Sequence, residues 1–418
     1  MREMKDSGVA WIGKIPHCWN TSKLKYLGQY INGYAFKPEE WGSKGVPIIR
    51  IQDLTGSNDN PNYFEGQIDK KYWVENGDIL ISWAATLDAF IWNKGNGWLN
   101  QHIFKAVPNR RIINYDFFFW MIKESMKNMN NDNKHGIFMQ HVTLSVFNNF
   151  TIPMPPLAEQ ERIAAFLDAE CAEIDAVLEK TRASIEEYRK LKQAVITQAV
   201  TKGIRGDRPM KDSGIEWIGD IPAEWDVVRI KNLFDYRNER NFKPLEEVNL
   251  ISLYTDKGVV QHCDLDETTG NKASNADGYK LVYENDIVVN IILCWMGAIG
   301  RSAYFGVTSP AYDVYSSKQK TNSKFYHYLF RTNGFSGDCY KVGRGIMAMR
   351  WRTYSDQFRA IKVVSPPQSE QEEIVEYLDE KCEGIDALIA KKQQYLTEIE
   401  NYKKSLIYEY VTGKKEVV

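Results

Sequence analysis

The sequence predicts an α+β protein of two similar globular domains, joined by two long antiparallel coiled-coil helices with pseudo-two-fold symmetry. Three observations predict this class. The chain of 418 residues repeats itself at an offset of nearly half its length. Each half ends in a segment almost free of Pro and Gly. Both of these segments carry apolar residues in a heptad pattern, which is typical of a coiled-coil seam.

The internal repeat begins at the opening of each half. The stretch MKDSGVAWIGKIPHCW at residues 4–19 returns as MKDSGIEWIGDIPAEW at 210–225, an offset of 206 residues. Near the end of each half, PPLAEQE at 155–161 returns as PPQSEQE at 366–372, an offset of 211. The two halves therefore keep nearly the same length. A tandem duplication without functional meaning is the alternative interpretation.

Composition shifts divide the chain into four parts. Each proline pair is followed by a long segment with acidic residues in its first turn, which favours a helix start. The predicted parts are a first globular domain at 1–154, a first long helix at 155–203, a second globular domain at 204–365 and a second long helix at 366–418.

The two long helices are expected to pair through one seam in the same heptad register. A segment of this length is on the order of 65 Å long at ~1.5 Å per residue, too long to be covered by one small domain. The seam is predicted from Leu167, Cys171, Ile174, Leu178, Ile185, Tyr188, Val195, Leu378, Cys382, Ile385, Ile389, Leu396, Ile399 and Leu406.

Four polar residues interrupt the seam. Thr181 and Lys392 take d positions, and Lys192 and Lys403 take a positions. The lysine stems are expected to lie along the apolar groove with their charges in water.

Composition favours a folded cytoplasmic protein. Hydrophobic residues make up 43% of the chain and aromatic residues 13%. No signal-peptide pattern and no apolar stretch long enough for a bilayer span occurs, so no membrane partner is expected. The six cysteines show no CxxC spacing and the six histidines no cluster, so no metal site is predicted.

Charge separates the globular parts from the helices. The net charge is −2, but residues 318–362 hold ten Lys or Arg against two acidic residues, and 94–134 hold seven against three. Basic stretches at comparable places in two repeats suggest phosphate contacts, although a single such stretch is usually solvated surface.

Taken together, these motifs resemble the specificity subunit of type I restriction-modification systems, over essentially the whole chain. The resemblance lies in Trp-Ile-Gly-x-Ile-Pro-x-x-Trp at 11–19 and 217–225, in the Asp-Ile-Leu/Val strands at 78–80 and 286–288, and in Pro-Pro-x-x-Glu-Gln before each helix. It implies two target recognition domains, a helical spacer and a role in bacterial or archaeal defence against foreign DNA.

The same resemblance implies the partners. These are double-stranded DNA, two DNA methyltransferase subunits that dock on the helices, and restriction or motor subunits where these join. S-adenosylmethionine would belong to the methyltransferase partner, and ATP with Mg to a motor subunit; no cofactor is expected in this chain. The chain lacks the Asn/Asp-Pro-Pro-Tyr/Phe motif of adenine methyltransferases and the Gly-x-x-x-x-Gly-Lys-Ser/Thr phosphate loop, so it is predicted to be non-catalytic.

The candidate DNA contacts are basic, amide, histidine and aromatic side chains in the variable middle of each half. Arg and Lys suit guanine, and Asn and Gln suit adenine, in the major groove. In the first domain they are Lys37, Trp83, Asn100, Gln101, His102, Lys134, His135, Gln140 and His141. In the second they are Arg237, Asn238, Arg240, Tyr312, Lys341, Arg344, Arg350, Trp351 and Arg352.

Different side chains on similar frames predict two different half-sites, hence an asymmetric bipartite DNA site. Three alternatives stay open. The chain could be a coiled-coil scaffold without DNA specificity, a stand-alone nuclease or methyltransferase, or a specificity chain that serves a methyltransferase-nuclease fusion.

Overall fold

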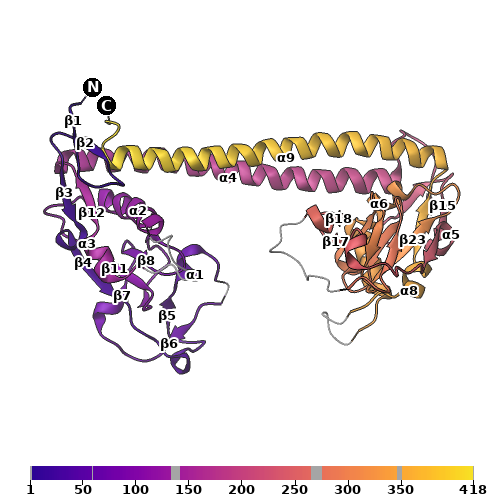
Figure 1. Ribbon diagram of the computed structural model, residues 1–418, viewed down its shortest axis with the longest axis horizontal. Helices are drawn as coiled ribbons and strands as arrows, with labels where there is room; N and C mark the ends of the chain where they lie inside the picture. The colour runs from indigo at the N-terminus through magenta and orange to yellow at the C-terminus, as the bar shows by residue number, and fades with distance from the viewer. Residues whose placement is uncertain (1, 59, 133–141, 265–274, 346–350, 418) are drawn as a thin grey trace. The chain divides into compact units, whose positions relative to one another are not determined.

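The computed structural model describes residues 2–58, 60–132, 142–264, 275–345 and 351–417 (Figure 1). It divides into two compact units. The first unit comprises Met1–Arg182 and Gln394–Val418, and the second comprises Ala183–Gln393. Each unit contains one globular part together with a portion of both long helices, α4 (Leu157–Lys202) and α9 (Gln368–Val411).

The globular part of the first unit is built mainly from short strands. The strands are β1 (Met4–Asp6), β2 (Lys14–Pro16), β3 (Asn20–Lys23), β4 (Gly28–Asn32), β5 (Val46–Ile49), β6 (Tyr63–Phe64), β7 (Trp73–Val74), β8 (Ile79–Ser82), β9 (Asp88–Ile91), β10 (Gly97–Leu99), β11 (Ile103–Pro108) and β12 (Thr151–Met154). The helices are η1 (Leu24–Tyr26), η2 (Pro38–Glu40), α1 (Ile51–Thr55), η3 (Lys70–Tyr72), α2 (Tyr115–Asp132) and α3 (Leu144–Asn149).

The central sheet of the first unit has the order β4-β11-β8-β9 with antiparallel neighbours. Alternate residues of β8 point to opposite faces, as the period of two requires. Ile79 and Ile81 join the core shared with α2 and the long helices. Leu80 joins a separate core with β7 and β10. The sheet is therefore covered on both faces, which explains why β8 is buried throughout and apolar up to Ser82.

The second unit repeats this plan. The strands are β13 (Met210–Asp212), β14 (Asp220–Pro222), β15 (Asp226–Arg229), β16 (Phe234–Arg237), β17 (Ile251–Tyr254), β18 (Gly258–Gln261), β19 (Lys280–Val282), β20 (Ile287–Asn290), β21 (Ile299–Arg301), β22 (Gly306–Thr308), β23 (Tyr312–Ser317) and β24 (Lys362–Ser365). The helices are α5 (Ile230–Leu233), η4 (Leu245–Glu247), η5 (His262–Asp264), η6 (Cys294–Met296), α6 (Ser323–Phe330), α7 (Asn333–Val342) and α8 (Ser355–Ala360).

The central sheet of the second unit has the order β16-β23-β20-β21, again antiparallel. Ile287 and Val289 of β20 face the helices, and Val288 faces the β17–β18 and β19–β22 pairs. The predicted α+β class with a repeated globular unit and long helices is confirmed.

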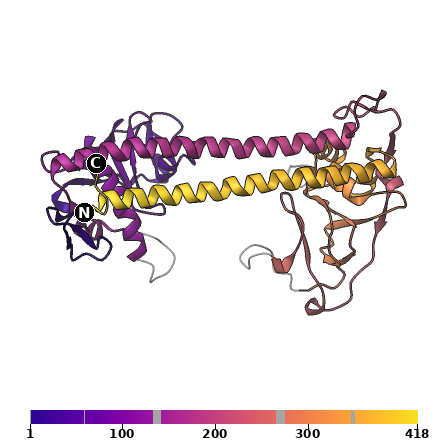
Figure 2. The same ribbon diagram turned by 90° about the horizontal axis from the view of Figure 1, so that it is seen from above.

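The helices α4 and α9 lie side by side and antiparallel within each unit (Figure 2). In the first unit Lys403 bonds Asp175 at 2.6 Å and Arg182 bonds Glu400 at 2.7 Å. In the second, Lys192 bonds Asp386 at 2.6 Å. Every residue of the predicted seam is buried or half-buried. Lys192 and Lys403 therefore place their charges on carboxylates of the facing helix, which the sequence expectation did not include, and the Lys392 ammonium lies 5.7 Å from the centroid of the Tyr188 ring.

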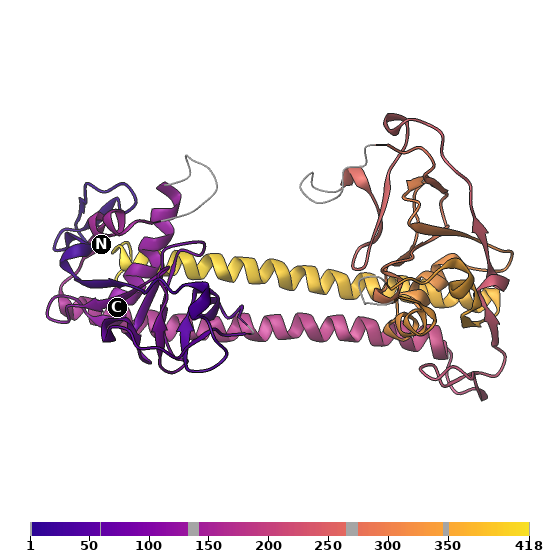
Figure 3. The same cartoon turned by 90° about the horizontal axis from the view of Figure 1, so that it is seen from below.

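The two ends of the chain lie together in the first unit (Figure 3). Lys414 Nζ, just beyond α9, donates to the carbonyl of Ile12 at 2.6 Å. In the second unit Lys202, at the end of α4, donates equivalently to the carbonyl of Ile218 at 2.8 Å. The end of each long helix thus fastens the Trp-Ile-Gly loop of one globular part. Within the described residues, no helix has both the length and the apolarity needed to cross a membrane.

Candidate nucleic-acid interface

In each unit several predicted contact residues gather at one end of the central sheet. In the first unit β4 and β8 end there and β9 and β11 begin there, as the pairing of Ser82 with Ile103 and Asp88 shows. In the second unit β16 and β20 end at the equivalent place, where β21 and β23 begin; Asn290 pairs with Tyr312 there. We call this region the loop end of each sheet.

The loop end of the first unit carries an aromatic surface. Trp83 follows β8 directly and stacks on Phe104 with ring centroids 5.8 Å apart. His102 immediately precedes β11, is exposed, and lies 5.6 Å from the Trp83 ring. An exposed imidazole therefore lies beside a half-buried indole. Val142 N–H donates to the Trp83 carbonyl at 3.0 Å, so the chain returns to this place after residue 141.

Asn100 and Gln101 form the turn that presents His102. The Asn100 side chain is 4% exposed and its Oδ1 accepts from His102 N–H at 3.3 Å. Its carbonyl lies against Gly33, where a Cβ would come within 2.0 Å. Asn100 therefore shapes the turn. Gln101 Oε1 is buried and without a hydrogen-bond partner among the described residues, an arrangement that favours a ligand or water donor at this point.

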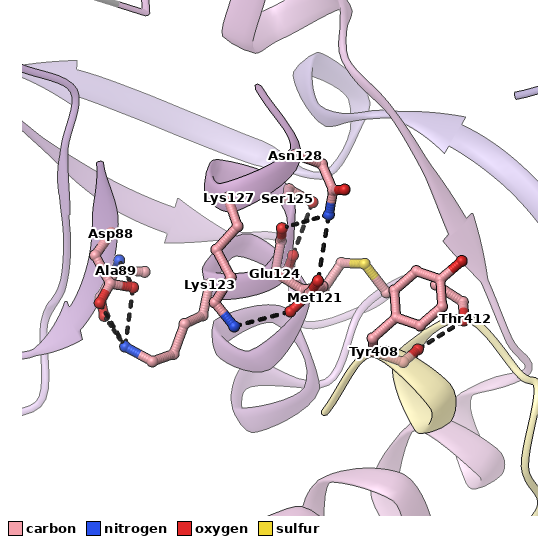
Figure 4. Close-up of polar contacts among 10 residues, drawn as sticks. All are labelled: Asp88, Ala89, Met121, Lys123, Glu124, Ser125, Lys127, Asn128, Tyr408 and Thr412. Atoms are coloured by element: carbon pink, nitrogen blue, oxygen red, sulfur yellow. Dashed lines mark hydrogen bonds and ion pairs between the residues drawn. The ribbon is translucent and has the colours of Figure 1, made fainter. Parts of the chain in front are cut away.

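An ion pair holds the hairpin that follows Trp83 against helix α2 (Figure 4). Lys123 Nζ lies 2.9 and 2.8 Å from the two carboxylate oxygens of Asp88, the first residue of β9. Lys127 bonds Glu124 at 2.9 Å, and Lys105 bonds Asp78 at 2.6 Å. These three cations of the basic stretch at 94–134 are neutralised inside the domain. They hold the frame and are not unpaired phosphate ligands, contrary to the expectation from the charge count.

Three predicted residues of the second unit lie where β16 leaves the sheet. Arg237 is bonded to Asp286 at 2.8 Å and to Glu239 at 2.6 Å. Burial raises the pKa of Asp286, and the guanidinium of Arg237 opposes that rise. Arg240 donates to the carbonyl of Gly278 at 3.0 Å and to Asn238 Oδ1 at 2.9 Å. Asn238 is exposed, whereas Arg237 already has two carboxylate partners.

Two arginines face each other at cross-strand positions beside the second loop end. Arg344 and Arg352 exchange both backbone hydrogen bonds, at 2.8 and 2.9 Å. Thr353 N–H then donates to the Ile291 carbonyl, directly after β20, at 2.9 Å. This contact matches that of Val142 with Trp83 in the first unit. Within the described ranges no carboxylate pairs with either arginine, and Arg352 Nη1 donates to the Trp351 carbonyl at 3.1 Å. Two like charges therefore stand at cross-strand positions without a counter-charge.

Aromatic rings lie next to the pair of Arg344 and Arg352. Trp351 stacks on Tyr340 with centroids 4.9 Å apart, and its Nε1 donates to the Tyr340 carbonyl at 3.1 Å. Gly343 permits this approach, because a Cβ there would come within 2.3 Å of Trp351 Nε1. Tyr312 begins β23 at the same loop end, where burial raises the pKa of its phenol. Its hydroxyl therefore stays protonated and can act as a donor.

The remaining predicted residues are not placed at the loop ends. Lys37 is exposed at the start of η2. Lys341, also exposed, bonds Glu216 at 3.0 Å. The residues Lys134, His135, Gln140, His141 and Arg350 lie outside the described residues.

The repeated motifs meet at a buried carboxylate in each unit. Glu370 is 0% exposed, accepts from Trp225 Nε1 at 2.9 Å and pairs with Arg208 at 2.7 Å. In the first unit Glu159 accepts from Trp19 Nε1 at 2.8 Å and pairs with Arg2. The Trp-Ile-Gly and Pro-Pro-x-x-Glu-Gln motifs therefore join each globular part to its long helix.

The glutamine of the same motif makes a second connection. Gln160 Oε1 accepts from Asn114 N–H at 2.8 Å, and its Nε2 donates to the Pro155 carbonyl at 2.9 Å. Gln371 repeats this with Asn322 at 2.9 Å and Pro366 at 2.8 Å. Both glutamines use donor and acceptor in buried positions, which explains why the residue type recurs.

Sequence comparison identifies this repeated arrangement. The family profile described as "Type I restriction modification DNA specificity domain" matches residues 16–187 and 222–400. The chain belongs to the type I restriction-modification DNA specificity family. Its function is accordingly DNA sequence specificity, as the resemblance implied.

Individual relatives agree with this assignment. The specificity subunit of type I restriction enzyme EcoBI from Escherichia coli is 26% identical over 315 residues, covering 72% of this chain and 65% of that protein, slightly less than two thirds. The MjaVIII specificity subunit from Methanocaldococcus jannaschii is 26% identical over 97% of this chain and 94% of its own length. A solved chain from work on complex assembly and conformational transition of the type I R-M system has a TM-score of 0.70 at 14% identity, covering 96% and 99%. That likeness concerns the fold.

The sequence did not predict the arginines of this specificity protein that pair with the buried glutamate at the start of each long helix. Arg2 and Arg208 stand at the repeat offset of 206, which was a usable signal. Their partners Glu159 and Glu370 were recognised only as part of a helix-entry motif. Tyr340 was also missed, because only the fold brings it under Trp351. Across the described segments, no group of three or more His, Cys, Asp or Glu is arranged to hold a metal ion.

Proposed function

We propose that this chain reads an asymmetric bipartite site in double-stranded DNA, with the loop end of each unit reading one half-site. The observation that carries the proposal is that the two loop ends share a frame but differ in side chains. The tethers from Val142 to Trp83 and from Thr353 to Ile291 are equivalent. One frame presents an indole and an imidazole, whereas the other presents two arginines and a tryptophan.

The second loop end suits a polyanion. Arg344 and Arg352 are cross-strand neighbours without a carboxylate partner in the described part of the chain. Opposed like charges cost stability in the free protein, and phosphates or guanine edges would relieve that cost. The adjacent Trp351 is half-buried and held by Tyr340. Its position is therefore set before DNA arrives, which lowers the entropy lost on binding.

The long helices are proposed to dock two DNA methyltransferase subunits. Beyond Leu157 in the first turn of α4, their exposed large apolar residues are Val177, Tyr395 and Tyr402 in the first unit and Leu191 and Leu388 in the second. These five residues beyond Leu157 take the same heptad position, g, next to the a–d seam. Exposed apolar side chains at one helical position are typical of a surface that packs another helix.

In this proposal the partner subunits carry out the catalytic reactions. The chain itself is proposed to be non-catalytic and to hold no cofactor. S-adenosylmethionine would be bound by the methyltransferase subunits, and ATP with Mg by a motor subunit where one joins. Whether methyltransferase and nuclease are separate subunits or one fused chain does not alter the roles proposed for these residues.

Two experiments on the complex with methyltransferase test the proposal. Replacing residues 20–150 by the corresponding domain of another specificity subunit should change one half-site of the methylated motif and leave the other intact. A change in both half-sites would contradict independent reading. Unchanged methylation in the swapped complex, with complex formation intact, would favour a scaffold without DNA specificity.

The second experiment concerns single residues. Arg344→Ala should weaken DNA binding and, if the contact is to phosphate, reduce the slope of log K against log salt by about 1. Lys341→Ala is the matched control, because Lys341 is paired with Glu216. Equal effects of the two variants would refute the proposal that Arg344 contacts DNA.

A further inference from the structure

Phe242 is exposed in a way that its repeat counterpart is not. Its side chain is 81% exposed, whereas Phe36, at the same place in the first half, is 4% exposed and packed with Ile48, Phe64 and Trp98. The sequence Phe-Lys-Pro is identical in both halves. The second unit therefore turns outward a side chain that the first unit uses in its core.

The turn beneath Phe242 is firmly built. Asn241 is 3% exposed, and its Nδ2 donates to the carbonyls of Lys243 and Ala276, both at 2.9 Å. Its Oδ1 accepts from Lys243 N–H at 3.1 Å, and its backbone N–H donates to Tyr279 at 2.7 Å. The side-chain amide of Asn241 thus bonds the chain on both sides of the turn. Phe242 lies at the apex of this turn with its side chain exposed.

The turn lies toward the loop end of the second unit. Arg240 forms a bridge with Lys280, which pairs with Thr308 at the end of β22. From Thr308 the chain continues through three residues into Tyr312, the first residue of β23 at the loop end. Phe305 lies at the opposite end of β22 and is 60% exposed. Phe242 therefore stands on the side of the β19–β22 pair that leads to the proposed DNA contacts.

We propose that Phe242 is an apolar wedge that inserts against a base step of the half-site read by the second unit. Arg240 and Lys243 flank it, and wedges of this kind act together with basic side chains that hold the backbone while stacked bases open. The inference rests on the proposed function. Because Phe36 is buried, the deformation is confined to one half-site, and base steps that open easily are favoured there without a hydrogen bond to a base.

The test uses the assembled complex with methyltransferase and duplexes that carry 2-aminopurine at successive positions of the second half-site. Binding should raise the fluorescence at one step, which reports unstacking. Phe242→Ala should abolish that rise and weaken binding on the order of tenfold, as expected for loss of one aromatic stacking contact. The salt slope should not change, because no phosphate contact is lost. Phe242→Trp should keep the signal.

Phe305→Ala is the matched control and should behave as the unmodified chain. If Phe242→Ala matches Phe305→Ala in fluorescence and affinity while Arg344→Ala weakens binding, the wedge is refuted and the proposed function stands. If Phe242→Ala instead weakens assembly with the methyltransferase and leaves the 2-aminopurine signal intact, Phe242 is a protein contact and the wedge is again refuted. Should Arg344→Ala also be silent, the proposed function itself fails.

Discussion

Removal of the Glu370 carboxylate should loosen the second globular part from its helix. Glu370 is fully buried, and its partner Arg208 has a side chain that is 11% exposed. Glu370→Ala leaves the indole N–H of Trp225 without its acceptor and takes the buried carboxylate away from Arg208, which keeps Glu224 at 2.9 Å and the Lys202 carbonyl at 3.0 Å as partners. A fully uncompensated buried charge would cost about 3–5 kcal/mol. Because Glu224 still compensates Arg208, the cost is that of the unsatisfied buried donors, about 1–3 kcal/mol. We expect a loss of that size in the stability of the second unit.

The two units are separate contact clusters, so a single unfolding midpoint would not isolate the effect. Hydrogen exchange followed by mass spectrometry measures the opening of each unit separately. Glu370→Ala should increase exchange in the second unit and leave the globular part of the first unchanged, and Glu159→Ala should do the reverse. Glu373→Ala removes an exposed pair with Arg205 and should change neither. The reasoning is refuted if Glu370→Ala costs less than about 1 kcal/mol or behaves like Glu373→Ala.

Three further changes have defined outcomes. Ala85 has a φ of 60°, so Ala85→Gly should stabilise the first unit by up to ~1 kcal/mol, measured by hydrogen exchange within that unit; faster exchange there would show that the backbone is not strained. Gly343→Ala should displace Trp351 and weaken binding of the second half-site about tenfold by DNA titration, whereas Gly337→Ala, with no atom within 4 Å of its new Cβ, should not. Burial lowers the pKa of His327 from 6.5 to about 3, so the unfolded chain takes up this proton first as pH falls. The second unit should have its full stability above about pH 6.5 and lose up to ~1.4 kcal/mol per pH unit as the pH falls toward 3. His327→Gln should make this loss smaller. An unchanged pH profile in the variant would contradict the role of His327.

Patterns within one segment predicted the long elements well. The heptad pattern predicted both helices, because each seam residue needs contacts only with its own helix and with the groove of the one facing helix. The structure places the end of α4 at Lys202, followed by Gly203 with a φ of 76°, which is a common way for a helix to end. The repeat also predicted that the globular parts share one plan.

The side-chain roles at the loop ends were less predictable, because they depend on partners distant in the chain. Arg237 was chosen as a DNA contact for its charge, but Asp286, 49 residues away, binds its guanidinium. Asn100 was chosen for its amide, which the fold uses inside a turn. Phe242 was not among the predicted contacts, and its motif Phe-Lys-Pro is identical in both halves. Only the packing shows that one copy is buried and the other exposed.

Methylome sequencing of a host that carries the neighbouring methyltransferase, with and without this chain, tests the assignment of DNA specificity. Expression of the chain should add methylation at one bipartite motif, with two dissimilar halves separated by an unread gap. Deletion should remove that motif and no other. Methylation that is identical in both strains would contradict the assignment of sequence choice to this chain.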